Sequence, residues 1–176
     1  MMRAPSVAEI SLYFVGLSLI AIGGANVVIP DMYRHVVEVR HWMSGTEFVA
    51  LAALSQAAPG PNVLIVSLIG WKLAGLPGAV VATAGMCVPS GILAYFFSGV
   101  WQRFEAARWR VIISVGLGAV TVGLILASGY ILTRTADHGW VAYAITASTA
   151  VLMLTTRVHP LWLLAVAATL GWCGLV

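Results

Sequence analysis

The residues with the most chemical potential form one stretch, Ser55-Gln56-Ala57-Ala58-Pro59-Gly60-Pro61-Asn62, inside an apolar run. That run extends from 48 to 71 and is long enough to cross a bilayer as a helix. Each of its two prolines lacks an N–H and clashes with the carbonyl four residues back, so the helix must break there. Unpaired backbone in hydrocarbon costs several kcal/mol per group, and the break therefore has to lie inside protein or beside a cavity.

The break offers hydrogen-bond donors and no acid. We expect Asn62 to be the N-cap of a new helix whose first N–H groups, which have no partner in the helix, point into the break. A helix N-terminus carries a partial positive charge and is a natural oxyanion site. Gly60 allows a ligand to approach closely. The pattern predicts a substrate site for a small inorganic oxyanion, formed by Ser55, Gln56, Pro59, Gly60, Pro61 and Asn62.

Two further apolar runs are expected to complete this site. The first, Ile10 to Ile29, is predicted as one span, and the third, Ala79 to Trp101, as another. Glycines there let a helix or a ligand approach the backbone, and a proline frees a carbonyl. Helix packing alone is the alternative interpretation of the glycines. The candidate residues in these runs are Gly23, Gly24, Asn26, Gly85, Pro89 and Ser90.

The composition is that of an integral membrane protein. The 176 residues are 61% hydrophobic and 9% charged, where a soluble domain carries about 25% charge. The runs lack the alternation of a transmembrane barrel, which leaves helices. The net charge of +3 lies between the spans, so it reports topology and no nucleic-acid partner is expected. No metal-ligand spacing or cofactor motif is present, and Cys87 and Cys173 are read as small core residues.

The predicted fold is a single all-α, polytopic membrane domain over residues 1–176. It has five or six spans, the number depending on whether the segment at Pro59-Gly60-Pro61 crosses fully or is re-entrant. Short apolar runs at Trp140 to Thr156 and Leu161 to Val176 end the chain. Charges expected to mark an entrance or the topology are Arg34, Lys72, Arg103, Arg108 and Arg110.

Residues between the first two runs carry much of the charge. We expect Asp31 to Gly45 to form an amphipathic helix at the membrane face, with Trp42 as an interfacial anchor. Ser44 followed by Glu47 has the spacing of a capping box and predicts a helix start.

Several motifs together resemble the chromate ion transporter family. The similarity runs from about Tyr13 to Trp101, roughly half the chain. It includes the pair Gly23-Gly24, the charged helix that ends at Trp42, and the pair Glu47-Phe48. It continues through Gln56-Ala57-Ala58-Pro59-Gly60-Pro61-Asn62, Gly70, Ala74-Gly75-Leu76-Pro77-Gly78-Ala79, Gly85 and Pro89-Ser90.

The resemblance implies export of chromate, with sulfate as a competing look-alike, coupled to protons, as in an antiporter, or to the membrane potential. It implies a multi-pass protein of the plasma membrane, the inner membrane of bacteria. Some members of the family consist of two homologous halves, and others are single halves that pair in antiparallel fashion. This chain resembles one half, so it is expected to form a homodimer or to pair with a homologous half.

Three other interpretations remain open. An amino-acid exporter of the lysine-exporter type also carries a Pro-Gly-Pro-Asn-like break, but a zwitterion needs a carboxylate, and the nearest acids, Asp31 and Glu47, lie at span ends. A membrane enzyme is not favoured, since no catalytic motif or pair of intramembrane carboxylates is present. A non-transporting subunit whose partner carries the substrate is the third.

Overall fold

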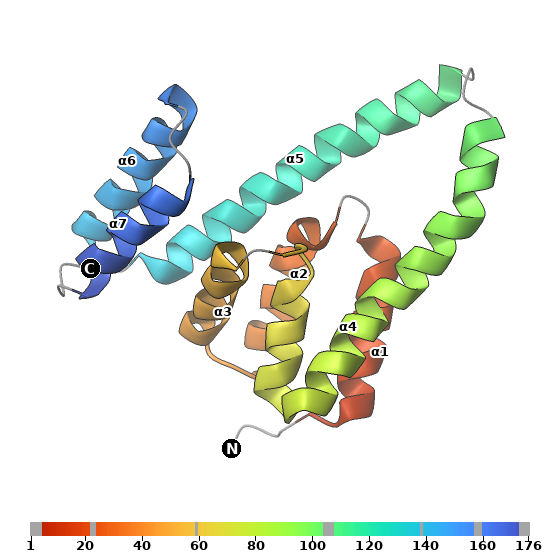
Figure 1. The fold of residues 1–176 in the computed structure, drawn as a ribbon, viewed down its shortest axis with the longest axis horizontal. Coiled ribbons are helices and arrows are strands. Elements are labelled where there is room, and N and C mark those ends of the chain that lie inside the picture. The colour runs from red at the N-terminus through yellow and green to blue at the C-terminus, as the bar shows by residue number, and fades with distance from the viewer. Residues whose placement is uncertain are drawn as a thin grey trace. The chain divides into compact units, whose positions relative to one another are not determined.

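The computed structural model describes residues 5–21, 24–58, 60–103, 108–137, 139–156 and 160–172. In these ranges the chain is entirely helical, with seven α-helices and no strand, as expected for an all-α protein (Figure 1). It divides into two compact units, residues 1–129 and 130–176. All candidate site residues belong to the first unit.

Helix α1, Val7–Ile20, begins at a capping box between Ser6 and Glu9. The predicted continuous span from Ile10 to Ile29 is wrong, because α1 ends at Ile20 and the following helical segment, Ala25–Val39, is bent from it by 113°. Gly24, with φ 100°, begins the new segment in a conformation that other residues rarely adopt. Gly24, which was expected to allow a close approach to the backbone, thus marks a change in the direction of the chain.

The segment after this bend is one helix with changing pitch. It starts as a 3₁₀ turn, η1 (Ala25–Val28), continues as α2 (Ile29–Tyr33) and widens into π turns, η2 (Arg34–Val39). The amphipathic helix expected over Asp31 to Gly45 is therefore wrong in both bounds. Trp42 lies beyond this helix, and its ring packs edge-on against His35 with centroids 5.6 Å apart.

Helix α3, Gly45–Ala57, and the first part of α4 form a hairpin. Ser44 and Glu47 make the predicted capping box at the start of α3. Lys72, eight residues into α4 (Leu64–Arg103), forms an ion pair with Glu47 at 2.9 Å between Nζ and Oε1. The start of α3 therefore lies beside residue 72, well inside α4. The two helices run antiparallel, and the break between them forms the tip of the hairpin.

Helix α4 itself folds back on Ala74 and Gly75, whose backbones are not helical. The hydroxyls of Ser67 and Thr83 are 2.7 Å apart, whereas sixteen residues of straight helix would separate them by about 24 Å. The second arm, residues 76–103, consequently runs antiparallel to the first, 64–73. The sequence Leu-Ala-Gly-Leu-Pro-Gly from Leu73 to Gly78 predicts a tight connection, and the reversal occurs there.

Helix α1 packs along the second arm of α4 (Figure 1). Gly85 makes the close approach possible, since a Cβ there would lie 3.3 Å from the Ser11 carbonyl oxygen and 3.5 Å from Phe14. Phe14, Ile10 and Leu17 of α1 are buried. Gly85 contacts the stretch from Ser11 to Val15, and Ser90, later in α4, bonds Ser18, later in α1. The two helices therefore run in the same direction.

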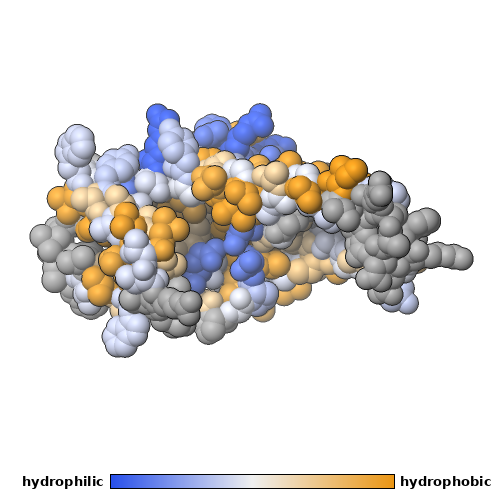
Figure 2. All heavy atoms as spheres, turned by 90° about the horizontal axis from the view of Figure 1, so that it is seen from above, coloured by the Kyte–Doolittle hydropathy of each residue, from blue (hydrophilic) through white to orange (hydrophobic). Residues whose placement is uncertain are grey.

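The later helices are predominantly apolar and exposed. They are α5 (Arg108–Ala136), α6 (Trp140–Thr155) and α7 (Pro160–Trp172), close to the predicted runs. Leu64–Gly99 and Ile112–Ala136 are long and apolar enough to cross a membrane, and the bent pair Val7–Ile20 with Ala25–Val39 would make a third span. Figure 2 shows hydrophobic side chains over much of the visible face. A lipid environment suits this surface.

The contact between the two arms of α4 gives a prediction. A Cβ on Gly78 would collide with the Gly70 carbonyl oxygen and lie 2.8 Å from the Ala74 Cβ. We expect Gly78→Ala to destabilise the protein by about 1–3 kcal/mol, the usual cost of overpacking, seen as a lower melting temperature in detergent. Gly91→Ala, on the same arm with nothing within 4 Å, is the matched control and should be neutral or slightly stabilising. Equal melting temperatures for the two variants would contradict the close contact.

Candidate functional site

The predicted break between α3 and α4 is present. Helix α3 ends at Ala57, Ala58 is extended with φ −76° and ψ 133°, and α4 begins only at Leu64. Pro59, which was predicted to help break the helix, lies outside the described residues. Gly60 and Pro61 are exposed. The carboxyl end of one helix and the amino end of the next therefore meet at the tip of the hairpin.

The start of α4 leaves backbone donors available. A 3₁₀ turn leads into it, with the Leu64 N–H bonded to the Pro61 carbonyl at 3.0 Å. In the part of the chain that the structure describes, the N–H groups of Asn62, Val63 and Ile65 have no backbone acceptor. The prediction that Asn62 caps this helix is wrong, because the helix starts two residues later and the exposed Asn62 side chain bonds no described residue.

Two other residues of the stretch behave differently from each other. Ser55 is buried and its hydroxyl donates to the Ala52 carbonyl of its own helix at 2.7 Å, so it does not face the break as a donor. Gly60 lies against Leu64, whose Cδ1 would be 2.7 Å from an added Cβ. A side chain at position 60 would therefore have to displace the flexible Leu64 side chain.

A hydrogen bond joins the two breaks. The Gln56 amide donates from Nε2 to Oδ1 of Asn26 at 3.2 Å. Asn26 lies in the first turn of the helical segment that Gly24 begins, while the other predicted residue there, Gly23, is outside the described residues. The sequence predicted both amides as site residues, and the structure brings them together. The N-terminus of the helical segment at Ala25 thereby lies beside the carboxyl end of α3.

Ser128 of α5 also reaches this cluster, and no sequence pattern singles it out. Its buried hydroxyl lies 3.0 Å from the Asn26 carbonyl oxygen and 2.8 Å from the Leu124 carbonyl oxygen. It is one of several hydroxyl residues in an apolar run, and those residues are indistinguishable by pattern.

Gly85, Pro89 and Ser90 lie on the contact between α1 and α4. Ser18 of α1, a residue that sequence reasoning missed, donates its hydroxyl to the Met86 carbonyl at 2.6 Å and accepts from the Ser90 N–H at 3.1 Å. It thereby supplies α1 hydrogen bonds where Pro89 interrupts the ladder of α4. No hydrogen bond in the described ranges joins these residues to the break.

Pro89 nevertheless lies at about the depth of the break. The arms of α4 pair at Ser67 and Thr83. Pro61 is six residues before Ser67, and Pro89 is six residues beyond Thr83, so continuing the antiparallel register brings both prolines to the same level along the axis. The interruption between α3 and α4 and the proline in the second arm of α4 therefore occur at a similar level along this axis.

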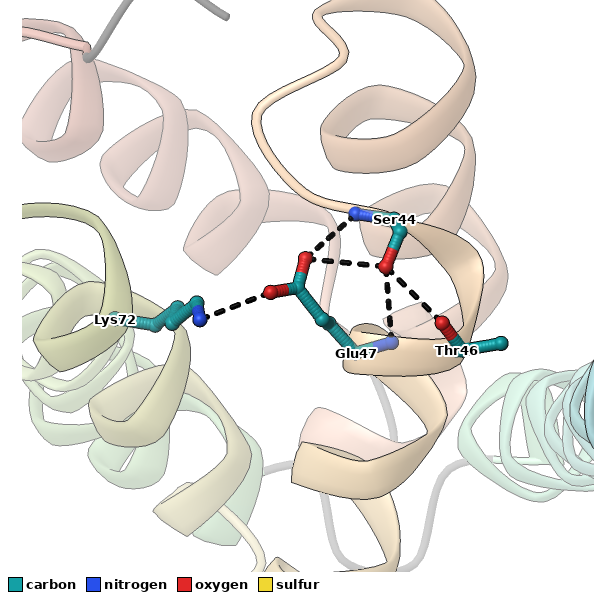
Figure 3. Close-up of polar contacts among 4 residues, drawn as sticks. All are labelled: Ser44, Thr46, Glu47 and Lys72. Atoms are coloured by element: carbon teal, nitrogen blue, oxygen red, sulfur yellow. Dashed lines mark hydrogen bonds and ion pairs between the residues drawn. The ribbon is translucent and has the colours of Figure 1, made fainter.

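Lys72 is paired and not free. Figure 3 shows the Glu47 carboxylate directed at Lys72 through one oxygen and at Ser44 through the other. The Ser44 backbone N–H and the Lys72 ammonium hold the pKa of Glu47 down at about 2, from an ordinary 4.5. Because the pKa is lowered, the pair stabilises the fold above pH 4.5 and loses that effect as the pH falls toward 2.

In the described residues, no contact joins the other predicted arginines to the cluster of Asn26, Gln56 and Ser128. Arg34 is exposed at the start of η2, and the side chains of Arg103, Arg108 and Arg110 lie outside the described residues. The described residues contain no group of three possible metal ligands. An open, mostly apolar groove lies elsewhere on α4, lined by Ser67, Ala79, Val80, Thr83, Ala84 and Cys87.

Comparison with known proteins gives consistent relatives. The chain is 28% identical over 161 residues to a protein named "Probable chromate transport protein" in Synechococcus elongatus, a match covering 89% of this chain and 41% of the relative. It is 25% identical over 169 residues to the "Chromate transport protein" of Cupriavidus metallidurans, covering 93% and 41%. The "Uncharacterized transporter YwrA" of Bacillus subtilis is 29% identical over 175 residues, covering 95% of this chain and 97% of that protein.

The chain thus spans about two fifths of the length of the two proteins named for chromate transport. No solved structure matches it. The family model described as "Chromate transporter" matches residues 8–172, nearly the whole chain and more than the resemblance read from its motifs. Members of this family are membrane transporters and not enzymes. With its paired amides beside two interrupted helices, this integral membrane protein belongs to the chromate transporter family.

Proposed function

We propose that the chain carries chromate across the membrane, and that the ion binds between the break of α3–α4 and the break after α1. The observation that carries this proposal is the hydrogen bond from Gln56 to Asn26, which ties the two interrupted helices together at their open ends. The family supports chromate as the ion. The geometry supports the place.

The chemistry of this cluster suits a tetrahedral dianion. Such an ion accepts many hydrogen bonds and needs positive potential without a competing acid. The open N–H groups of Asn62 and Val63 and the partial charges of two helix N-termini supply both. Transporters use paired half-helices in this way. Two acids, Asp31 and Glu47, have partners. The Asp31 carboxylate accepts a hydrogen bond from the Tyr13 hydroxyl, and Glu47 forms an ion pair with Lys72.

We further propose that α3 and the first arm of α4 form a re-entrant hairpin. Thirteen residues of α3 rise about 20 Å, short of the roughly 30 Å of hydrocarbon. The break then lies near mid-membrane, and the expected number of spans becomes five: the α1 pair, the second arm of α4, α5, α6 and α7.

The short chain needs a second half in this proposal. The relatives named for chromate transport are more than twice as long as the part matched here. We propose that the chain forms a homodimer, or an antiparallel pair with a homologous half. Each chain then contributes one membrane domain, and the assembly lies in the bacterial plasma membrane. Chromate leaves the cell, coupled to protons or to the membrane potential, and sulfate competes with it because it has the same charge and shape.

The direct test is chromate accumulation in cells that express the chain alone or with a candidate second half. Expression should lower accumulation, while Asn62→Ala and Gly60→Leu should abolish this effect with membrane insertion intact. Asn62 bonds no described residue, so its loss should spare the fold. Gly91→Ala is the matched control for a glycine replacement. Full activity of both site variants would refute the site, and no effect of the wild type in either setting would refute the function.

A charge test separates an oxyanion from a zwitterionic amino acid. Asn26→Asp keeps an oxygen for the Gln56 amide to donate to, but adds a negative charge. Repulsion of a dianion at about 5 Å is worth several kcal/mol, so chromate transport should fall tenfold or more. Asn26→Ala, which adds no charge, should be less affected. An Asn26→Asp variant as active as the wild type would favour an amino-acid substrate.

Lys72 is proposed as an entrance charge that Glu47 holds in place. Lys72→Gln should raise the chromate concentration for half-maximal transport about three- to fivefold, because attraction across roughly 10 Å of water is lost. Glu47→Gln should leave that concentration unchanged or lower it, since the cation stays. Initial rates at low and high ionic strength measure both. Equal impairment by the two variants would mean that the ion pair only closes the hairpin.

A further inference from the structure

We propose that Ser128 of α5 is a positioning residue of the transport site, which acts by holding the backbone of Asn26. This inference rests on the proposed function. Ser128 lies 102 residues from Asn26 in the sequence, and its hydroxyl reaches the Asn26 carbonyl at 3.0 Å.

The hydroxyl is placed to do more than satisfy its own helix. Ser128 is 5% exposed, the one buried polar side chain on the described part of α5. Its single proton is shared between the Leu124 carbonyl at 2.8 Å and the Asn26 carbonyl. Thr121, two turns earlier, bonds only the Leu117 carbonyl of the same helix at 2.9 Å. The two residues therefore differ in the one contact that leaves α5.

Asn26 needs such support because of where it lies. It follows Gly24, at the point where the first helix is interrupted and turns by 3₁₀ geometry. A carbonyl there, in hydrocarbon, is costly without a donor. Ser128 supplies that donor at the main chain, and Gln56 supplies one at the side-chain oxygen.

With its main-chain and side-chain oxygens both bonded, Asn26 has one group left for a ligand, the side-chain amide nitrogen. Its Nδ2 amide donates to no described residue, so two N–H bonds remain available to an oxyanion. The orientation of that amide depends on the main chain that Ser128 holds. Loss of the hydroxyl should therefore weaken binding of the ion before it weakens the fold.

The experiment compares four forms of the full chain reconstituted in vesicles together with any second half it requires: wild type, Ser128→Ala, Ser128→Thr and the matched control Thr121→Ala. We expect Ser128→Ala to raise the half-saturating chromate concentration about 3- to 15-fold, as for the loss of one interhelical hydrogen bond, with the maximal rate within about twofold. Ser128→Thr, which restores the hydroxyl, and Thr121→Ala should stay near the wild type.

Hydrogen exchange of the backbone amides at 25–28 gives a second readout that needs no transport. It should be faster in Ser128→Ala than in Thr121→Ala. If Ser128→Ala matches Thr121→Ala in half-saturation and exchange, the inference is overturned while the proposed function stands. A purely structural serine would lower the amount of folded protein and leave half-saturation unchanged, which also overturns it. If the wild type moves no chromate, the proposed function fails and this inference fails with it.

Discussion

The constraint on which this structure depends is that backbone N–H and C=O groups must find partners in hydrocarbon. The chain violates helical pairing at three described places: after Ile20, between Ala57 and Leu64, and at Ala74 and Gly75. Each break would be prohibitive if lipid surrounded it. In the first unit, other segments supply hydrogen-bond partners to the backbone groups that the breaks leave unpaired.

The three breaks are not equivalent, and the difference separates a structural role from a functional one. At Ala74 and Gly75 the two arms of α4 close tightly, with Gly70 against Gly78. The break before Leu64 instead keeps open N–H groups beside exposed residues. A backbone that reverses for packing leaves no donors unused, whereas a site must. We therefore propose the break before Leu64, and not the reversal at Ala74 and Gly75, as the place of the chemistry.

Sequence alone predicted the features that depend on local physics. The break at Pro59-Gly60-Pro61, the capping box of Ser44 and Glu47 and the reversal before Gly78 follow from residues within a few positions of one another. The end of α1 at Ile20 was missed, because a glycine pair permits a straight helix as readily as a bent one. Ser128 and Ser18 were missed because their partners lie 102 and 68 residues away, and an isolated serine in an apolar run carries no sign of them.

The charges near the cluster explain why the proposed site would favour anions over cations. A second property is then needed to separate chromate from sulfate. Glu47 forms an ion pair with Lys72, which offsets its charge, and Asp31 accepts a hydrogen bond from the Tyr13 hydroxyl. Neutral amides and N–H groups then favour any small dianion. Chromate and sulfate present the same tetrahedron of oxygens, and donors alone cannot tell them apart. Selection between the two must therefore come from the size of the proposed site, to which Gly60, beside Leu64, and a second chain both contribute in the proposed arrangement.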